Sequence, residues 1–151
     1  MAWKLITALL LVPNVLAVPA PDGSLCVKTV PENCTLTFIG DIGSAKTYGQ
    51  QKSWWRIAQI YDNTCKLIGS RERREPTFEA LTGIVPFSID SALRWTTDVK
   101  RLNFYGDYNS ISFRYGAYSY DGAFDCLLIG DYLSDKAGAK NNVCRHQFPC
   151  K

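Results

Sequence analysis

The chain of 151 residues contains a single histidine, His146. Nucleophilic and acid–base catalysis near neutral pH commonly uses histidine, so this scarcity removes most of the usual catalytic arrangements. The chain also lacks the GxSxG, HExxH, GxGxxG and P-loop motifs of hydrolases, metalloproteases and nucleotide-binding proteins. We therefore expect a non-enzymatic protein with no catalytic residues and no cofactor. One alternative stays open, a small secreted hydrolase or nuclease that pairs His146 with a carboxylate.

Three further absences limit the partners of this protein. Beyond its first residues the chain has no run of about 20 apolar residues, so we expect no membrane anchor. Its formal net charge of +3 is too small to favour nucleic acid or an anionic lipid surface. No CxxC pair occurs, and one histidine among widely spaced cysteines predicts no metal site.

The N-terminus has the order of charge, apolar core and small residues that is typical of a secretory signal peptide. Lys4 precedes an apolar run over residues 5–12, and Val15 and Ala17 occupy the positions of a cleavage site. We therefore predict a signal peptide over residues 1–17 and a secreted, extracellular protein.

The mature chain is then expected to contain one domain. Cleavage after Ala20 is an alternative to cleavage after residue 17. Residues 18–25 are polar and contain proline and glycine, which predicts a loose N-terminal leader. Residues 26–151 have the length of a single domain with its own core.

Six cysteines remain after the signal peptide, and an even number in a secreted chain predicts three disulfides. The pairing stays open from the sequence alone, although Cys126 with Cys144 is a plausible local pair. We also expect bridges that tie both chain ends to the body of the domain. The predicted disulfide cysteines are Cys26, Cys34, Cys65, Cys126, Cys144 and Cys150.

Short segments rich in aromatic and β-branched residues recur at intervals of about 8–12 residues, which predicts an all-β sandwich or Greek-key barrel. Ile111, Phe113 and Tyr115 alternate with polar residues, as expected for a half-buried strand. Residues 101–115 are therefore a candidate hairpin. At most one short helix is expected, over residues 74–83.

Two segments share a pattern. The letters YDNTCKLIGS begin at Tyr61 and YDGAFDCLLIGD begin at Tyr120. One strand design used twice, or an internal duplication, would explain the pattern. We expect Cys65 and Cys126 each to start a core strand. Five side chains of these strands are expected to be largely buried: Leu67, Ile68, Leu127, Leu128 and Ile129.

Exposed aromatic and basic residues are the candidate binding surface. Aromatic side chains bring contact area at little entropic cost, but they are also good strand formers, so strand packing is the alternative. The basic cluster in residues 71–74 fits a solvated loop, a proteolytic processing site or an anion site. The candidate surface consists of Trp54, Trp55, Tyr105, Tyr108, Tyr118, Arg71, Arg73 and Arg74.

Two asparagines are candidate glycosylation sites. Asn33 begins the sequon Asn33-Cys34-Thr35, so we predict a glycoprotein modified there. Asn63 begins the rare form that ends in cysteine, which requires Cys65 to be unpaired when the sequon is met.

The signal peptide, the six cysteines, the β-rich pattern and the segments YDNTCKLIG and CRHQFPC resemble fungal small secreted cysteine-rich proteins. The resemblance implies an effector or virulence role, exerted by binding a host protein or an apoplastic glycan. The stretch from Tyr115 to Gly122 is also similar to the Greek-key motif of βγ-crystallins. That similarity implies the runner-up function, a secreted killer-toxin-like or antimicrobial protein.

Overall fold

The computed structural model describes residues 23–47, 50–73, 80–102, 111–130 and 140–151, and these residues form two antiparallel sheets. The predicted signal peptide lies outside them. The larger sheet has the strand order β3-β2-β1-β9-β8. Its strands are β1 (Asn33–Thr47), β2 (Gln50–Tyr61), β3 (Leu67–Glu72), β8 (Asp125–Gly130) and β9 (Lys140–Pro149).

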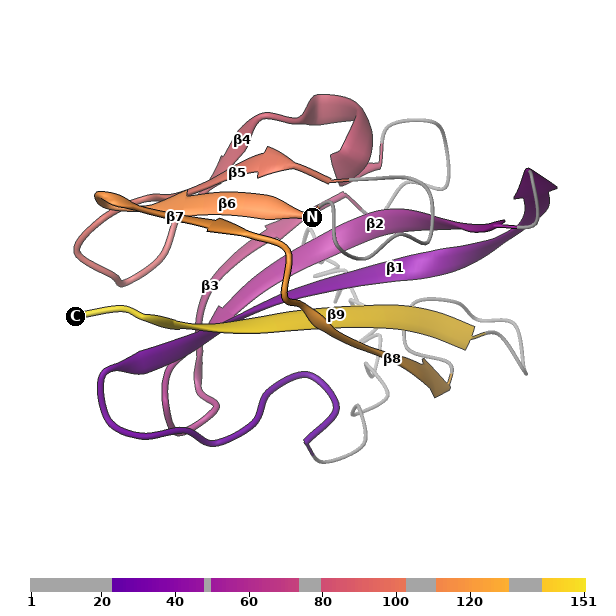
Figure 1. Cartoon of the computed structure of the whole chain (residues 1–151). Coiled ribbons are helices and arrows are strands. Elements are labelled where there is room, and N and C mark those ends of the chain that lie inside the picture. Colours follow the sequence, from indigo (N-terminus) through magenta and orange to yellow (C-terminus); the bar gives the residue numbers. More distant parts are fainter. Residues whose placement is uncertain (1–22, 48–49, 74–79, 103–110, 131–139) are drawn as a thin grey trace, which may run out of the picture.

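The smaller sheet lies against the larger one, above it in Figure 1. Its order is β4-β5-β6-β7, with β4 (Phe87–Ile89), β5 (Thr97–Arg101), β6 (Ser112–Tyr115) and β7 (Tyr118–Asp121). Two facing sheets confirm the all-β prediction and favour its sandwich form over a closed barrel. The predicted helix is reduced to one 3₁₀ turn, η1 (Leu81–Ile84), in the part of its range that the structure describes.

The main core fills the space between the sheets. Ile111, Phe113 and Tyr115 are each 1% exposed, so the predicted alternation is confirmed. Phe113 and Phe148 meet edge to face with ring centroids 5.3 Å apart, which joins the smaller sheet to β9. The Tyr115 hydroxyl donates a hydrogen bond of 3.0 Å to the carbonyl of Cys150, so this buried polar group is satisfied.

Strands β5 and β6 are neighbours, but β5 shares only Arg101 with the hairpin predicted over residues 101–115. They pair antiparallel, with Thr97 opposite Tyr115 and Arg101 opposite Ser112. The pairing confirms that the two strands are neighbours, while the connecting residues 103–110 lie outside the described part of the chain.

Three disulfides are present, as predicted, and they indicate an oxidising environment. The local pair Cys126–Cys144 is confirmed, and it joins the neighbouring strands β8 and β9. Two bridges tie the chain ends to the body. These are Cys34–Cys150, which closes 116 residues, and Cys26–Cys65, which closes 39.

A smaller core lies on the outer face of the larger sheet. Ile39, Ile57, Ile129 and Val143 are buried there, and Leu25 packs against them. Leu25 belongs to the N-terminal arm, residues 23–30, which precedes β1. The arm therefore contributes to a second, satellite core.

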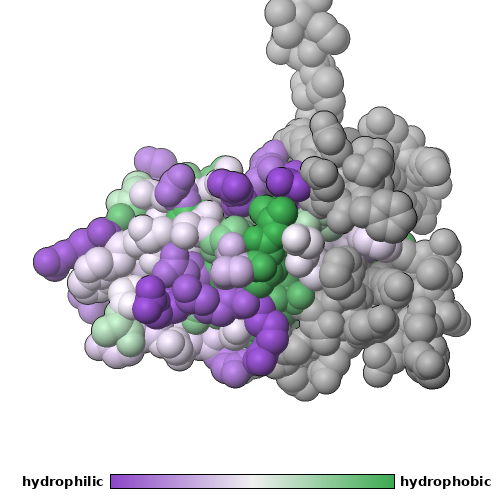
Figure 2. Space-filling model, turned by 90° about the horizontal axis from the view of Figure 1, so that it is seen from above, coloured by the Kyte–Doolittle hydropathy of each residue, from purple (hydrophilic) through white to green (hydrophobic). Residues whose placement is uncertain are grey.

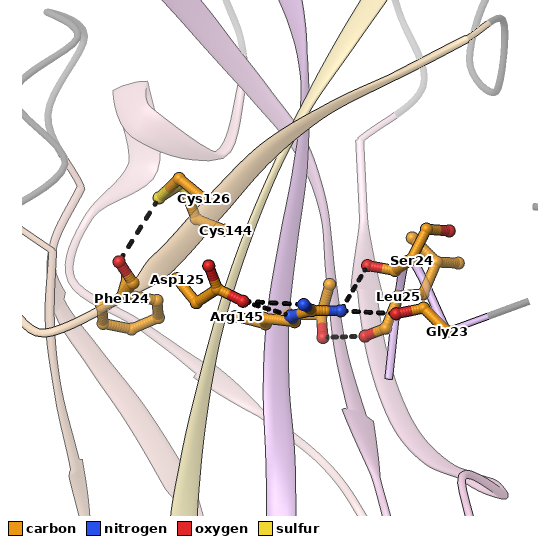
Figure 3. Close-up of polar contacts among 9 residues, drawn as sticks. Gly23, Ser24, Leu25, Phe124, Asp125, Cys126, Cys144 and Arg145 are labelled. Carbon is orange, nitrogen blue, oxygen red and sulfur yellow. Dashed lines mark hydrogen bonds and ion pairs between the residues drawn. A yellow bond between two sulfur atoms is a disulfide. The ribbon is translucent and has the colours of Figure 1, made fainter. Parts of the chain in front are cut away.

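Arg145 of β9 fastens the start of this arm to the sheet (Figure 3). Its Nε and Nη2 donate to Asp125 Oδ2 at 2.9 and 2.7 Å, while Nη1 donates to the carbonyls of Gly23 and Ser24. The Thr37 hydroxyl donates to the Leu25 carbonyl at 2.6 Å. The last three residues of the leader expected to be loose are thus held in place, because their carbonyls find donors on β1 and β9.

The burial expected for the two repeated segments is wrong at two leucines. Leu67 is 48% exposed and Leu128 is 53% exposed, whereas Ile129 is buried as predicted. Ile68 and Leu127 are half-buried. Strands β3 and β8 are the edges of the larger sheet, where one of the two faces of a strand has less protein to pack against.

Candidate functional site

A row of polar side chains crosses the outer face of the smaller sheet. The strand register places Ser88 opposite Asp98, Asp98 opposite Arg114, and Arg114 opposite Ser119. Their sequence neighbours on β4, β5 and β6 are buried, so alternation along each strand turns these four side chains away from the core. The row joins all four strands of the sheet.

Asp98 is the centre of this row. Ser88 Oγ donates to Asp98 Oδ1 at 2.8 Å, Arg114 Nη2 donates to Oδ2 at 3.0 Å, and Lys100 Nζ lies 3.6 Å from Oδ2. The Ser88 hydrogen bond, followed by the Arg114 hydrogen bond and the charge of Lys100, holds the pKa of Asp98 below its usual value despite partial burial. The carboxylate is therefore ionised at neutral pH and held in one position.

Trp95 lies beside this row, two residues before β5 begins, and is 39% exposed. Its ring meets Tyr115 edge-on, with centroids 5.5 Å apart. Gly116 lies against the same ring with φ +57°, and a Cβ there would come within 2.9 Å of the indole. Glycine is thus required both for the turn and for the close approach of the ring. The Arg94 guanidinium lies 5.1 Å from the ring centroid, within cation–π range.

An open pocket of about 350 Å³ lies beside Trp95. On the face of the molecule that Figure 2 shows, hydrophilic side chains cover much of the coloured surface and an apolar strip lies among them. The pocket is lined by Ser88, Trp95, Thr96, Asp98, Arg114 and Gly116. It combines a partly exposed indole with one carboxylate and one guanidinium, which suits recognition of a polar ligand that has an apolar face.

The described aromatic residues of the predicted binding surface do not form one surface, because one of them is buried. Trp55 is 2% exposed and packs edge to face against Phe38, so its assignment to a binding surface is wrong. Its neighbour Trp54 is half-buried, because successive strand residues face opposite sides. Tyr118 is 64% exposed on β7. Residues 105 and 108 lie outside the described part of the chain.

Of the described basic residues of the predicted surface, Arg71 belongs to the larger sheet and Arg73 directly follows strand β3. Arg71 is exposed on β3 and pairs across the ladder with Ala58, and Arg73 is half-buried. The Arg73 amide donates to the Arg56 carbonyl at 2.7 Å. Arg71 and Glu72 therefore belong to a paired strand and line no part of the Trp95 pocket. Residue 74 is outside the described part of the chain.

His146 contacts a turn and aromatic rings. Its Nδ1 lies 3.0 Å from the carbonyl oxygen of Ala123, which can only accept, so Nδ1 donates. The rings of Phe113, Tyr120 and Phe124 surround it with centroids 5.1–5.6 Å away. None of the hydrogen bonds among the described residues joins His146 to a carboxylate, so the pair needed by the hydrolase hypothesis is not formed there.

The two candidate glycosylation sites lie at one end of the sandwich. The amide of Thr29 donates to the carbonyl of Asn63 at 3.1 Å, and the Thr29 hydroxyl donates to the carbonyl of Asn33 at 3.4 Å. Both asparagines are half-exposed. The disulfide of Cys65 shows that the rare sequon at Asn63 would have to be used before this bridge forms.

Neither a metal site nor a membrane span is found among the described residues. Those residues contain no group of three or more histidines, cysteines or carboxylates placed to hold a metal ion. None of their helical segments has the length and hydrophobicity that a bilayer crossing needs.

No family model, curated protein or solved structure matches this chain.

Sequence reasoning missed four site residues, which are Ser88, Trp95, Asp98 and Arg114. The alternation of Thr97 to Arg101 was a usable signal, because it turns Asp98 and Lys100 outward when Val99 is buried. The meeting of Asp98 with Ser88 and Arg114 depends on the register of three strands, which local patterns do not specify.

Proposed function

We propose that this protein is a secreted, non-enzymatic binding protein that recognises a carbohydrate at the Trp95 pocket. The observation that carries the proposal is the exposed indole of Trp95 beside an ordered row of hydrogen-bonding side chains. The apolar C–H face of a sugar ring can stack on an indole, while its hydroxyl groups need fixed donors and acceptors at the ring edge. Asp98 and Arg114 supply both kinds of group.

Preorganisation supports binding at this pocket. Ser88, Asp98 and Arg114 stand on three paired strands, and Asp98 is held by donors on both oxygens. Groups that are already ordered lose little freedom when a ligand arrives, so more of the interaction energy appears as affinity.

The composition of the pocket favours binding over hydrolysis. Glycoside hydrolysis uses a pair of carboxyl groups, one of them a proton donor. Among the described residues that line the pocket there is one carboxylate, Asp98, and its lowered pKa suits an acceptor rather than an acid.

The proposed setting is outside the cell. Three disulfides and the predicted signal peptide support secretion. With the resemblance to small secreted fungal proteins, this setting makes an apoplastic or cell-wall glycan of a host the proposed partner, and an effector the proposed biological role.

The test is titration calorimetry of the disulfide-bonded protein against a panel of soluble plant and fungal cell-wall oligosaccharides. We expect Trp95→Ala to weaken binding at least about tenfold, or about 1.4 kcal/mol, because the stacking surface is removed. Tyr118→Ala is the matched control, since Tyr118 is a more exposed aromatic residue that does not line the pocket. Equal binding by Trp95→Ala and wild type, or no binding of any oligosaccharide, would overturn the proposal.

A further inference from the structure

The Trp95 pocket has more hydrogen-bond donors than it can satisfy internally. The Asp98 carboxylate offers about four lone-pair sites, and Ser88, Arg114 and Lys100 already approach them. Arg114 carries about five N–H groups, and its one hydrogen bond to the protein uses Nη2. The Arg114 side chain is 51% exposed, so its remaining donors face solvent. A ligand at this position therefore meets more free donors than free acceptors.

A second guanidinium lies near the pocket without lining it. Arg94 lies over the Trp95 ring, and among the described residues it forms no ion pair with a carboxylate. One guanidinium therefore lines the pocket and a second covers the indole, while the carboxylate in the pocket is already shared between Arg114 and Lys100. The local electrostatic balance favours a ligand with negative charge.

We propose that the ligand of this pocket is an acidic glycan whose sugar carries a carboxylate, that is, a uronate. This inference rests on the proposed function and specifies its substrate class. The planar carboxylate of the ligand would accept hydrogen bonds from the Arg114 guanidinium, whose fork of donors matches two carboxylate oxygens. The pyranose ring that carries the carboxylate would contact the exposed part of the Trp95 indole.

The basic residues extend beyond the pocket along β5. Lys100 and Arg101 follow Asp98 toward the end of the strand, and Arg101 is itself paired with Asp121. From Thr97 to Arg101 the strand rises by about 13 Å, at about 3.3 Å per residue. This length accommodates an oligomer with several carboxylates rather than a single sugar.

The experiment compares a short oligogalacturonate with its fully methyl-esterified form, which has the same sugar rings but no charge. We expect wild type to bind the acid at least about tenfold more tightly than the ester at low salt, with the preference reduced at high salt. Arg114→Gln should lose most of this preference and still bind the ester, because Trp95 remains. Circular dichroism checks that the variant is folded.

Arg71→Gln is the matched control, because it removes the same charge from an exposed position on the other sheet. It should keep the preference of wild type for the acid.

Equal affinity for acid and ester would overturn the acidic-glycan inference and leave carbohydrate binding intact. An equal loss in Arg71→Gln and Arg114→Gln would also overturn it, because general charge would then explain the preference. Binding of neither oligosaccharide, with other glycans of the panel bound, would reject the uronate. Failure across the whole panel would reject the proposed function itself.

Discussion

The segments that begin at Tyr61 and Tyr120 share the letters Tyr-Asp, then Cys, then Leu-Ile-Gly, but they make different connections. The first turns from β2 back to its neighbour β3 within the larger sheet. The second leaves β7 of the smaller sheet and enters β8 of the larger one. The same letters thus serve a hairpin in one place and a crossover between layers in the other. This difference favours two uses of one strand design over an internal duplication.

The turn of the first segment is held by its own side chains. Asp62 Oδ1 accepts hydrogen bonds from the Thr64 amide at 2.9 Å, the Thr64 hydroxyl at 2.7 Å and the Lys66 amide at 3.0 Å. Cys65 then adopts φ +66° before β3 begins. Local hydrogen bonding of this kind is the usual reason for aspartate in a turn.

The crossover of the second segment is held by residues distant in sequence. Gly122 and Ala123 have φ +71° and +56°, and the Gly122 amide donates to the Ile111 carbonyl at 2.9 Å. His146 of β9 donates to the Ala123 carbonyl. The single histidine therefore anchors the connection between the two sheets, which a local pattern does not reveal.

The largest expected losses of stability come from removing the two cystines. Replacing Cys26 and Cys65 together by serine should lower the free energy of unfolding by about 4 kcal/mol, against about 3 kcal/mol for Cys126 and Cys144. The bridges close 39 and 18 residues, so the first restricts the unfolded chain more. Urea unfolding of the two double variants measures both values. A larger loss for the shorter bridge would contradict the chain-entropy explanation.

A smaller effect separates the two glycines that end the Leu-Ile-Gly pattern. A Cβ on Gly69 would come within 2.4 Å of the Ser91 side chain and 2.7 Å of the Asp90 carbonyl, whereas a Cβ on Gly130 meets nothing within 4 Å. We expect Gly69→Ala to cost about 2 kcal/mol by overpacking. Gly130→Ala should stay within about 0.5 kcal/mol of wild type. Comparable urea midpoints for the two variants would refute the difference in packing.

The smallest expected effect concerns Asp62 and the loss of folding stability at acidic pH. The Thr64 and Lys66 hydrogen bonds lower the pKa of Asp62 from 3.8. Because the folded value lies below the unfolded one, the contribution of Asp62 is fully present above about pH 4 and is lost as the pH falls through the lowered value. Asp62→Asn should therefore flatten the fall in stability below pH 4.

Asp121→Asn is the matched control in the second segment, where the aspartate forms an exposed ion pair with Arg101. Urea midpoints between pH 2 and 7 compare the two variants. The explanation fails if Asp62→Asn keeps the acid slope of wild type.

Composition and periodicity predicted the parts of the fold that depend on local physics. Alternation identified the buried face of Ile111, Phe113 and Tyr115, and the even number of cysteines predicted three bridges. The same reasoning placed Leu67 and Leu128 in the core, where they are not. It could not tell an edge strand from a central one, since both carry similar apolar letters.

The candidate site was likewise predicted only in part from local sequence patterns. An exposed tryptophan was expected, but among Trp54 and Trp55 rather than at Trp95. Trp95 is placed by its contacts with Tyr115 and with the turn at Gly116. The row of Ser88, Asp98 and Arg114 exists because strands from three stretches of the chain align in one register.

By itself, the sequence determined that this chain forms β-strands, with an even set of cysteines and a single histidine. Hydrophobic alternation and cysteine chemistry act within a few residues or through simple counting, so they are visible in the letters. Only the tertiary structure decided which cysteines pair, which of the two similar segments crosses between the sheets, and which polar side chains meet beside Trp95. Those outcomes depend on strand order and register, which are set by packing between residues far apart in the chain.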